Sequence, residues 1–327
     1  MQQMKHMSIL VPQGQNNLSS IVGSYKIFSR ANDRFKALGR EAVFKIELVG
    51  TTEKIDFHDG LFSVHPHRDL SSLASTDLIL VPSLNHNLDL ALRENKEMMQ
   101  WIQDQYKAGA EIASICTGAF LLAGAGVLDG KTCSTHWAAA DEFRQLFPEV
   151  HLTTDALITD EKGIYTNGGA YSFLNLIIYL IEKYYNRETA IYCSKVFQIE
   201  FQRNTQSEFA IFAGQKQHGD DLIEQAQLLI ENNVETKVFV EELSTKFAVS
   251  RRTFDRRFVK ATGNTPTEYA QRVKMEAAKK SLENTRKTVN EVMYEVGYND
   301  PKSFRTIFQR ITGLSPVDYR SKYNKGS

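Results

Sequence analysis

The chain has 327 residues, 42% of them hydrophobic, and a formal net charge of zero, which suits one or two folded domains. We expect no disulfide framework, because the three cysteines include no Cys-x-x-Cys pair. The sequence shows no signal peptide and no apolar run long enough to span a bilayer, so we expect no membrane span and a cytoplasmic location. The neutral total hides two parts of opposite sign, because 19 of 39 basic but only 10 of 39 acidic residues lie from Thr236 onward, which gives +9 there and −9 before it.

The first 200 residues alternate short apolar runs with helical patterns. Predicted strands lie at residues 8–11, 43–49, 78–81 and 111–115, and near Leu157 and Ile164. Predicted helices lie at residues 88–106, 119–127, 171–184 and 188–201. This alternation is typical of a parallel sheet covered by helices, so we expect a doubly wound α/β domain.

In such a fold, ligands bind in the loops at the carboxyl ends of the strands. Cys116 is the sharpest candidate there, because it directly follows a strand and opens a helix, a position that favours the thiolate. His136 is the only obvious base for it, and no carboxylate is placed to orient that histidine. The residues expected to line the pocket are Gly14, Ser83, Asn85, Cys116, Thr117, Gly118, His136, Gly168 and Gly169.

Several interpretations of this pocket are open. It could bind a small polar effector, act as a Cys-His hydrolase or amidase through Cys116 and His136, or sense redox state through Cys116. An inert, packed cysteine explains Cys116 alone equally well, since free cysteine is among the most buried residue types. His65 and His67 alternate along one strand, but no further ligand stands at a recognised spacing, so we expect no metal and no cofactor.

The last third of the chain repeats itself at a spacing of 50 residues. Six positions recur without a gap, as Phe254, Phe258, Thr262, Gly263, Pro266 and Tyr269 in the first copy and as Phe304, Phe308, Thr312, Gly313, Pro316 and Tyr319 in the second. A polar stretch at 204–218 predicts a linker, so we expect an α/β domain at 1–203 and an all-α domain at 219–327.

Each copy has the pattern of two short helices joined by a tight turn, a helix-turn-helix. Ser250 is a good N-cap for the second helix of the first unit, Thr288 and Glu291 form a capping-box pattern in the second unit, and Pro301 restarts the chain there. The helix that begins at Pro266 would span roughly 27 Å, which suits two units placed on consecutive turns of duplex DNA. A basic module of this kind predicts double-stranded DNA as its partner.

Residues 220–323 resemble the AraC/XylS family of bacterial transcription activators. The resemblance lies in Gly297-Tyr298, Phe304, Phe308, Gly313, Ser315-Pro316 and Tyr319-Arg320. It implies that the first unit presents Arg252, Asp255 and Arg256 to bases and that the second presents Lys302, Ser303 and Thr306. Thr306 departs from the family, which usually has arginine there. Arg251, Arg257 and Arg305 are expected to contact phosphates.

The run 113–123, followed by Leu128-Asp129-Gly130 and Ser134-Thr135-His136-Trp137, resembles the ThiJ/PfpI superfamily, with its class I glutamine amidotransferase-like, flavodoxin-like fold. Joined to an AraC-type domain, it is most similar to the GlxA-type regulators. The resemblance implies a small effector, nitrogenous in some relatives, a homodimer formed through the α/β domain, and RNA polymerase as a partner of an activator. Enzymes of the superfamily often have histidine after the cysteine and an acid after the first strand. This chain has Thr117 and residues 15–19 without an acid, so we expect no catalysis.

Overall fold

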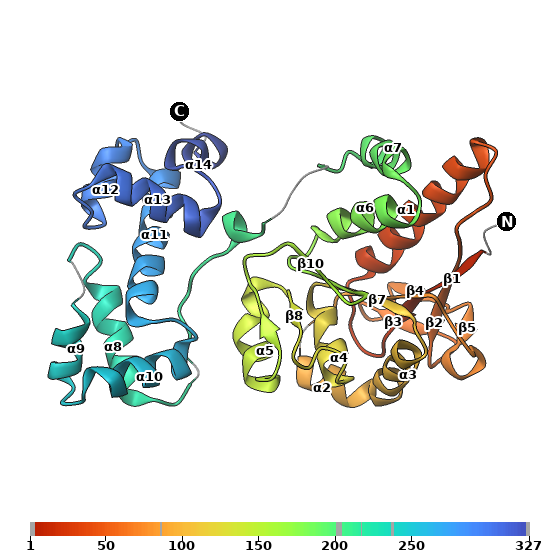
Figure 1. Ribbon diagram of the computed structural model, residues 1–327, viewed down its shortest axis with the longest axis horizontal. Coiled ribbons are helices and arrows are strands. Elements are labelled where there is room, and N and C mark those ends of the chain that lie inside the picture. The colour runs from red at the N-terminus through yellow and green to blue at the C-terminus, as the bar shows by residue number, and fades with distance from the viewer. Residues whose placement is uncertain (1–3, 86, 201–204, 217, 237–238, 325–327) are drawn as a thin grey trace. The chain divides into compact units, whose positions relative to one another are not determined.

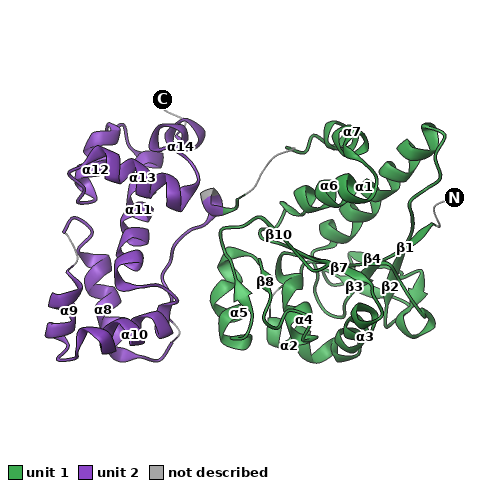
Figure 2. Cartoon of the chain, viewed as in Figure 1, with its two compact units in different colours: residues 1–206 green, residues 207–327 purple. Residues whose placement is uncertain are grey.

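The computed structural model describes all residues except 1–3, 86, 201–204, 217, 237–238 and 325–327 (Figure 1). The chain divides into two compact units, Met1–Gln206 and Ser207–Ser327 (Figure 2). Of the linker predicted at 204–218, Asn204 and Gln217 lie outside the described residues. Thr205 and Gln206 belong to the first unit, and Ser207 begins the second.

A seven-stranded sheet forms the centre of the first unit, in the order β10-β11-β7-β6-β1-β2-β5. Its strands are β1 Lys5–Val11, β2 Phe44–Gly50, β5 Arg68–Asp69, β6 Leu78–Val81, β7 Glu111–Ile115, β10 Ile158–Glu161 and β11 Ile164–Asn167. All neighbours pair in parallel except β10, which runs antiparallel to β11. Two small separate sheets pair β3 Ile55–Phe57 with β4 Phe62–Val64 and β8 Thr132–Cys133 with β9 His151–Leu152.

Helices cover both faces of this sheet (Figure 1). One layer comprises α1 Leu18–Ala37, α6 Phe173–Tyr184 and α7 Arg187–Phe197. The other comprises α2 Leu88–Glu94, α3 Lys96–Lys107, α4 Ala119–Gly124 and α5 Ala140–Leu146. Because successive side chains of a strand point to opposite faces, Ile9 of β1 joins the first core and Leu10 joins the second. The fold is therefore the doubly wound, flavodoxin-like α/β sheet that the sequence predicts.

The first unit departs from the predicted elements at several points. The helix expected at 88–106 is two helices that meet at Asn95, because the side chain of this residue binds the backbone of Gln13. Its Oδ1 accepts from the Gln13 amide at 2.8 Å, and its Nδ2 donates to the Gln13 carbonyl at 3.1 Å. Strand β10 forms an antiparallel hairpin with β11 in a sheet expected to be parallel. The 20-residue helix α1 and the short α5 are not among the predicted elements. The last residue of the helix expected at 188–201 lies outside the described residues, and α7 ends at Phe197.

All regular elements among the described residues of the second unit are helices. Its elements are η4 Ser207–Phe209, α8 Asp221–Asn232, α9 Val240–Lys246, α10 Arg251–Thr262, α11 Pro266–Asn284, α12 Val289–Glu295, α13 Pro301–Thr312 and α14 Pro316–Tyr323. The predicted caps are confirmed: Ser250 accepts a hydrogen bond from the Thr253 amide, and Thr288 and Glu291 form a capping box. Helices α9 and α10 form the first helix-turn-helix, and α12 and α13 form the second. We call α10 and α13 the recognition helices.

The two copies of the repeat match in their hydrogen bonds as well as in their sequence. The Tyr269 hydroxyl donates to Glu231 at 2.5 Å, and the Tyr319 hydroxyl donates to Glu283 at 2.5 Å. The buried positions that the copies share are Phe254, Phe258, Thr262, Pro266 and Tyr269 in one and Phe304, Phe308, Thr312, Pro316 and Tyr319 in the other. One supersecondary unit is therefore present twice.

Helix α11 belongs to both cores of this unit. Tyr269 at its start packs with α8 and α10, whereas Met275, further along, packs with α12 and α13. Between them, the buried Lys274 ammonium donates to the carbonyl oxygens of Val234, at 2.6 Å, and Val296, at 2.9 Å. With 19 residues, α11 is about 28 Å long. This helix fixes the spacing of the two recognition helices.

The turn of the first helix-turn-helix contains a strained residue that offers a test of the fold. Ala248 has a φ of 51°, in the left-handed region that favours glycine, and Gly297, which follows the end of α12 as Ala248 follows the end of α9, has a φ of 73°. Ala248 is exposed, so its methyl group contributes little packing. We expect Ala248→Gly to stabilise the protein by about 0.5–1 kcal/mol and to raise its thermal midpoint by a few degrees.

The matched control is Ala277→Gly, within α11, which should destabilise the protein by about 1 kcal/mol because its backbone is helical. Calorimetry compares the two variants. A lower midpoint for Ala248→Gly would contradict the left-handed conformation of this turn.

Candidate functional site

The order of the strands reverses between β1 and β6, so the carboxyl ends of these two strands form the topological switch point where doubly wound folds bind ligands. The loops after the two strands are joined by backbone hydrogen bonds, from the Asn17 amide to the Ser83 carbonyl and from the Asn85 amide to the Gln15 carbonyl, both at 2.8 Å. Gly14 lies in the first of these loops, at a φ of 86°. The structure thus brings Gly14, Ser83 and Asn85 to one edge of the sheet.

Cys116 directly follows the next strand along, β7, and begins the 3-10 turn Cys116–Gly118 that leads into α4. Its φ of 55° makes this turn unusually tight, and the side chain is only 4% exposed. Gly118 is required there, since a Cβ at that position would lie 2.6 Å from the Pro82 carbonyl oxygen. The loop after β6 and the turn after β7 are therefore in direct contact.

Burial raises the pKa of the Cys116 thiol above its ordinary value. The hydroxyl of Ser83, the Thr117 hydroxyl and amide and the Gly169 amide all act in the opposite direction, but burial outweighs them. The expected thiolate is therefore wrong. A helix N-terminus lowers a thiol pKa only where the charged form keeps some solvation.

Thr117 occupies the position after the cysteine and joins the two loops. Its hydroxyl donates to the Leu84 carbonyl at 2.6 Å, accepts from the Leu84 amide at 2.9 Å and lies 3.0 Å from the Ser83 hydroxyl. All of these contacts hold the turn after β7 against the loop after β6. Thr117 therefore supplies no base to Cys116.

His136 lies near this edge but has a structural role in its own turn. Its Nδ1 accepts a hydrogen bond from the Ala138 amide at 3.1 Å, so the ring proton of the neutral form is on Nε2. Burial lowers the pKa of His136, which keeps the imidazole neutral at pH 7. Among the described residues, no hydrogen bond joins the ring to Cys116. The adjacent Thr135 hydroxyl does contact the turn, donating to the Cys116 carbonyl at 2.9 Å.

Gly168 and Gly169 close the site from β11. A Cβ at Gly168 would lie 2.0 Å from Nε2 of Gln206, and Gly169 has a φ of 94°. The nine predicted pocket residues thus come from neighbouring loops on one edge of the sheet. Their role in binding stays a prediction. Gln206, which sequence analysis had assigned to the linker, is a further residue of this edge.

No group of three His, Cys, Asp or Glu side chains suited to a metal occurs in the part of the chain that the structure describes. Nδ1 of His67 accepts from the Leu48 amide at 2.9 Å, and its ring stacks on Tyr25. Over the same residues, no helix is both long and apolar enough to cross a membrane.

In the second unit, the recognition helices carry exposed polar and basic residues. Seven of the predicted DNA contacts are exposed, namely Arg251, Arg252, Arg256, Lys302, Ser303, Arg305 and Thr306. Asp255 is half-buried and accepts from Arg251 Nε at 2.8 Å, and Arg251 also forms an ion pair with Glu241. Arg252 and Arg256 form no ion pair among the described residues, which leaves their charge available to a ligand.

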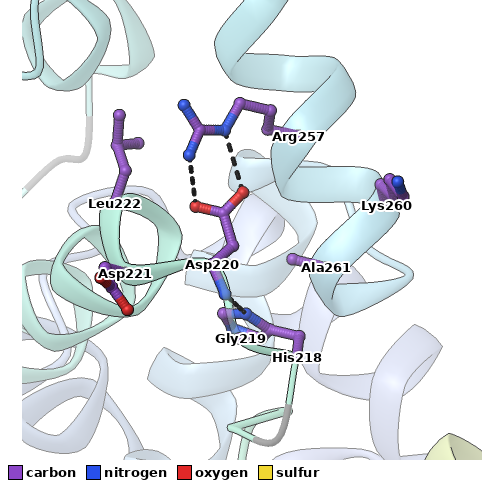
Figure 3. A pocket seen from close by; sticks show the side chains of 8 residues that line it. All are labelled: His218, Gly219, Asp220, Asp221, Leu222, Arg257, Lys260 and Ala261. Carbon is purple, nitrogen blue, oxygen red and sulfur yellow. Dashed lines mark hydrogen bonds and ion pairs between the residues drawn. The ribbon is translucent and has the colours of Figure 1, made fainter.

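Arg257, expected at a phosphate, instead binds Asp220 through two hydrogen bonds, of 2.9 Å from Nε and 2.6 Å from Nη2 (Figure 3). Asp220 also caps α8 by accepting from the Ile223 amide. The pair lines an open groove of about 600 Å³ together with His218, Gly219, Asp221, Leu222, Lys260 and Ala261. Arg257 therefore attaches the first recognition helix to the start of α8.

Comparisons with known proteins agree with both units. Residues 28–183 match the DJ-1/PfpI family and residues 243–322 match a helix-turn-helix domain. The transcriptional regulator GbdR of Pseudomonas aeruginosa is 26% identical over 266 residues, 80% of this chain and 70% of GbdR. The transcriptional regulator ArgR of the same species is 26% identical over 222 residues, 68% of this chain and 67% of ArgR.

Solved structures match the first unit. A putative transcriptional regulator from Vibrio parahaemolyticus has a TM-score of 0.53 at 24% identity, over 59% of this chain and 99% of that one. Drosophila melanogaster DJ-1β has a TM-score of 0.51 at 16% identity, over 60% and 99%. These likenesses establish the fold.

A DJ-1/PfpI domain joined to two helix-turn-helix units defines a DNA-binding regulator of transcription. The chain thus combines a DJ-1/PfpI domain with an AraC-type helix-turn-helix domain, and GbdR and ArgR, to which it is similar, are transcriptional regulators.

The burial of Cys116 predicts how the thiol reacts. Because its pKa is raised, alkylation by iodoacetamide should be slower at pH 7–8 than that of free cysteine and should keep rising above about pH 8.5, where free thiols have already titrated. Peptide mass spectrometry across pH measures this rate, with Cys116→Ser as the blank. Half-maximal reaction below pH 7 would mean that the thiolate is stabilised after all.

Proposed function

We propose that the protein is a sequence-specific transcription activator whose two recognition helices bind consecutive major grooves and whose α/β unit binds a small polar effector. RNA polymerase is the expected partner of such an activator, and a homodimer formed through the α/β unit is the expected assembly. A DNA-binding regulator of bacterial type acts in the cytoplasm.

The duplicated unit is the observation that carries the DNA part of this proposal. Two similar cores, each with a buried tyrosine bonded to a glutamate, present α10 and α13 from one helix of about 28 Å, close to the roughly 34 Å between major-groove faces on one side of B-DNA. The exposed cations of the recognition helices and the charge of +9 from Thr236 onward favour a polyanion.

The edge of the sheet supports the effector part. It offers hydroxyl groups, amides and a neutral imidazole around Cys116, a set that hydrogen-bonds to a small polar molecule without giving it a base. One observation favours the alternative of a cysteine hydrolase or amidase, namely the positive φ of Cys116, which is typical of strained functional turns. Against it, Thr117 and His136 both hydrogen-bond within structural turns. The low exposure of Cys116 also disfavours the third interpretation, a redox sensor.

Two neighbouring arginines of α10 test DNA recognition as a matched pair. Arg256→Ala should cost about 1–3 kcal/mol on the cognate site and relax specificity at one or two base pairs, because an exposed arginine of a recognition helix reads base edges. Arg257→Ala removes a partly exposed ion pair with Asp220 and should lower stability only slightly, with specificity unchanged.

Fluorescence anisotropy on cognate and random duplexes measures both variants against wild type. An equal loss on the two duplexes for Arg256→Ala would assign that side chain to a phosphate. Altered base preference in Arg257→Ala would show that Arg257, rather than Arg256, contacts the bases.

Cys116→Ser separates the effector site from an enzyme. A binding site predicts no cysteine-dependent turnover of amides, esters or reactive aldehydes by the wild type, because Cys116 has neither a thiolate nor a base. Multiple turnovers that fall roughly 100-fold in kcat in both Cys116→Ser and His136→Ala would instead identify a nucleophile and its base.

A further inference from the structure

Helix α10 exposes one apolar side chain on the face that carries its arginines. All residues of α10 are described, and the exposed ones are Arg251, Arg252, Arg256, Val259 and Lys260. Four of these five are cations, whereas Val259 is apolar and 43% exposed. The buried face of the same helix carries Phe254, Phe258 and Thr262. The core of the unit therefore does not require an apolar residue at position 259.

Helical geometry places Val259 beside the arginines proposed to read bases. At about 100° per residue, Arg252, Arg256 and Val259 lie within roughly 60° of one another around the helix axis. Val259 lies about 4.5 Å beyond Arg256 along this axis, and successive base pairs of DNA are about 3.4 Å apart. A recognition helix that holds Arg256 at one base pair therefore holds Val259 at about the next one along the groove.

Valine at this position does not favour the helix itself. Its helix propensity is lower than that of Ala, Lys, Arg or Gln, because branching at Cβ restricts χ1 against the preceding turn. The same branching holds its two methyl groups in a fixed direction. The major-groove edge of the base pairs offers one apolar group that such a surface can contact, the C5-methyl group of thymine.

The second recognition helix carries a different residue at the equivalent place. The 50-residue repeat aligns Val259 with Gln309, which is exposed on α13 together with Lys302 and Thr306. A glutamine side chain forms two hydrogen bonds with N6 and N7 of adenine. The buried positions of the two units match, whereas this exposed position differs, so the two helices are suited to different bases.

We propose that Val259 determines specificity by contacting the C5-methyl group of a thymine about one base pair from the base that Arg256 reads, and that Gln309 selects adenine at the equivalent place in the other half-site. The inference rests on the proposed binding of α10 and α13 to DNA. It predicts that the two half-sites differ in sequence, although the two units share one fold.

The experiment uses the full chain and a duplex recovered by selection of genomic DNA. The base pair read by Arg256 is the one at which substitutions cease to matter in Arg256→Ala, and a thymine is expected next to it. Replacement of that thymine by deoxyuridine removes only the C5-methyl group. Anisotropy should show that the wild type binds the deoxyuridine duplex roughly fourfold more weakly, which is the effect of exposing one buried carbon group.

Val259→Ala completes a double-mutant cycle with the deoxyuridine substitution. The variant should fold at least as stably as the wild type because alanine has the higher helix propensity, so weaker binding would not reflect unfolding. It should bind the thymine duplex about fourfold more weakly or worse and lose little further affinity on the deoxyuridine duplex. Val196→Ala is the matched control, since Val196 is 44% exposed on α7 of the first unit, and it should respond to deoxyuridine as the wild type does.

Exchange of the two residues tests the choice of base. Val259→Gln should shift the preference at this base pair from thymine toward adenine by about tenfold, because it replaces a methyl contact with two hydrogen bonds. Gln309→Val should shift the preference in the other half-site from adenine toward thymine.

Losses from Val259→Ala and from deoxyuridine that are simply additive would overturn the contact between the two groups. The lack of a thymine within about two base pairs of the Arg256 position would overturn it as well. If Arg256→Ala relaxes specificity while deoxyuridine has no effect, DNA recognition by α10 stands and the role of Val259 is wrong. If selection recovers no preferred sequence, the proposed function fails, and this inference fails with it.

Discussion

Helix α11 is the constraint on which the second unit depends. Because its first turns belong to one hydrophobic core and its last turns to the other, neither helix-turn-helix can move along or around it without breaking a core. The buried Lys274 ammonium reinforces this, since it bonds one backbone carbonyl near each helix-turn-helix, and burial lowers its pKa. In the proposed complex with DNA, such a rigid spacer would join two weak base-reading surfaces into one bivalent surface, in which the second contact follows the first at high effective concentration.

The first unit has the fold of DJ-1/PfpI proteins, and the polar groups at its edge are engaged within its own loops. Thr117 ties two loops together, His136 caps its own turn, and the Cys116 thiol is held neutral by burial. What is left open at the edge is a set of hydrogen-bonding groups rather than a nucleophile and base.

Local signals in the sequence predicted most of the fold. Ser250 and Pro266 mark helix starts through capping, which depends only on residues close together in the sequence. Features that depend on distant partners were not predictable in this way. Asn95 breaks a helix by binding a loop 82 residues away, Arg257 pairs with Asp220 across 37 residues, and the thiol pKa of Cys116 follows from burial by the whole fold. The antiparallel direction of β10 likewise depends on pairing rather than on composition.

Helical phasing tests the central claim that α11 holds two recognition helices on consecutive major grooves. On a site recovered by selection of genomic DNA with the purified protein, five base pairs inserted between the half-sites rotate one of them by about half a turn. Anisotropy should then show an affinity close to that of a single half-site, whereas the same insertion outside the half-sites should have no effect. Unchanged affinity with the central insertion would contradict the rigid two-headed account.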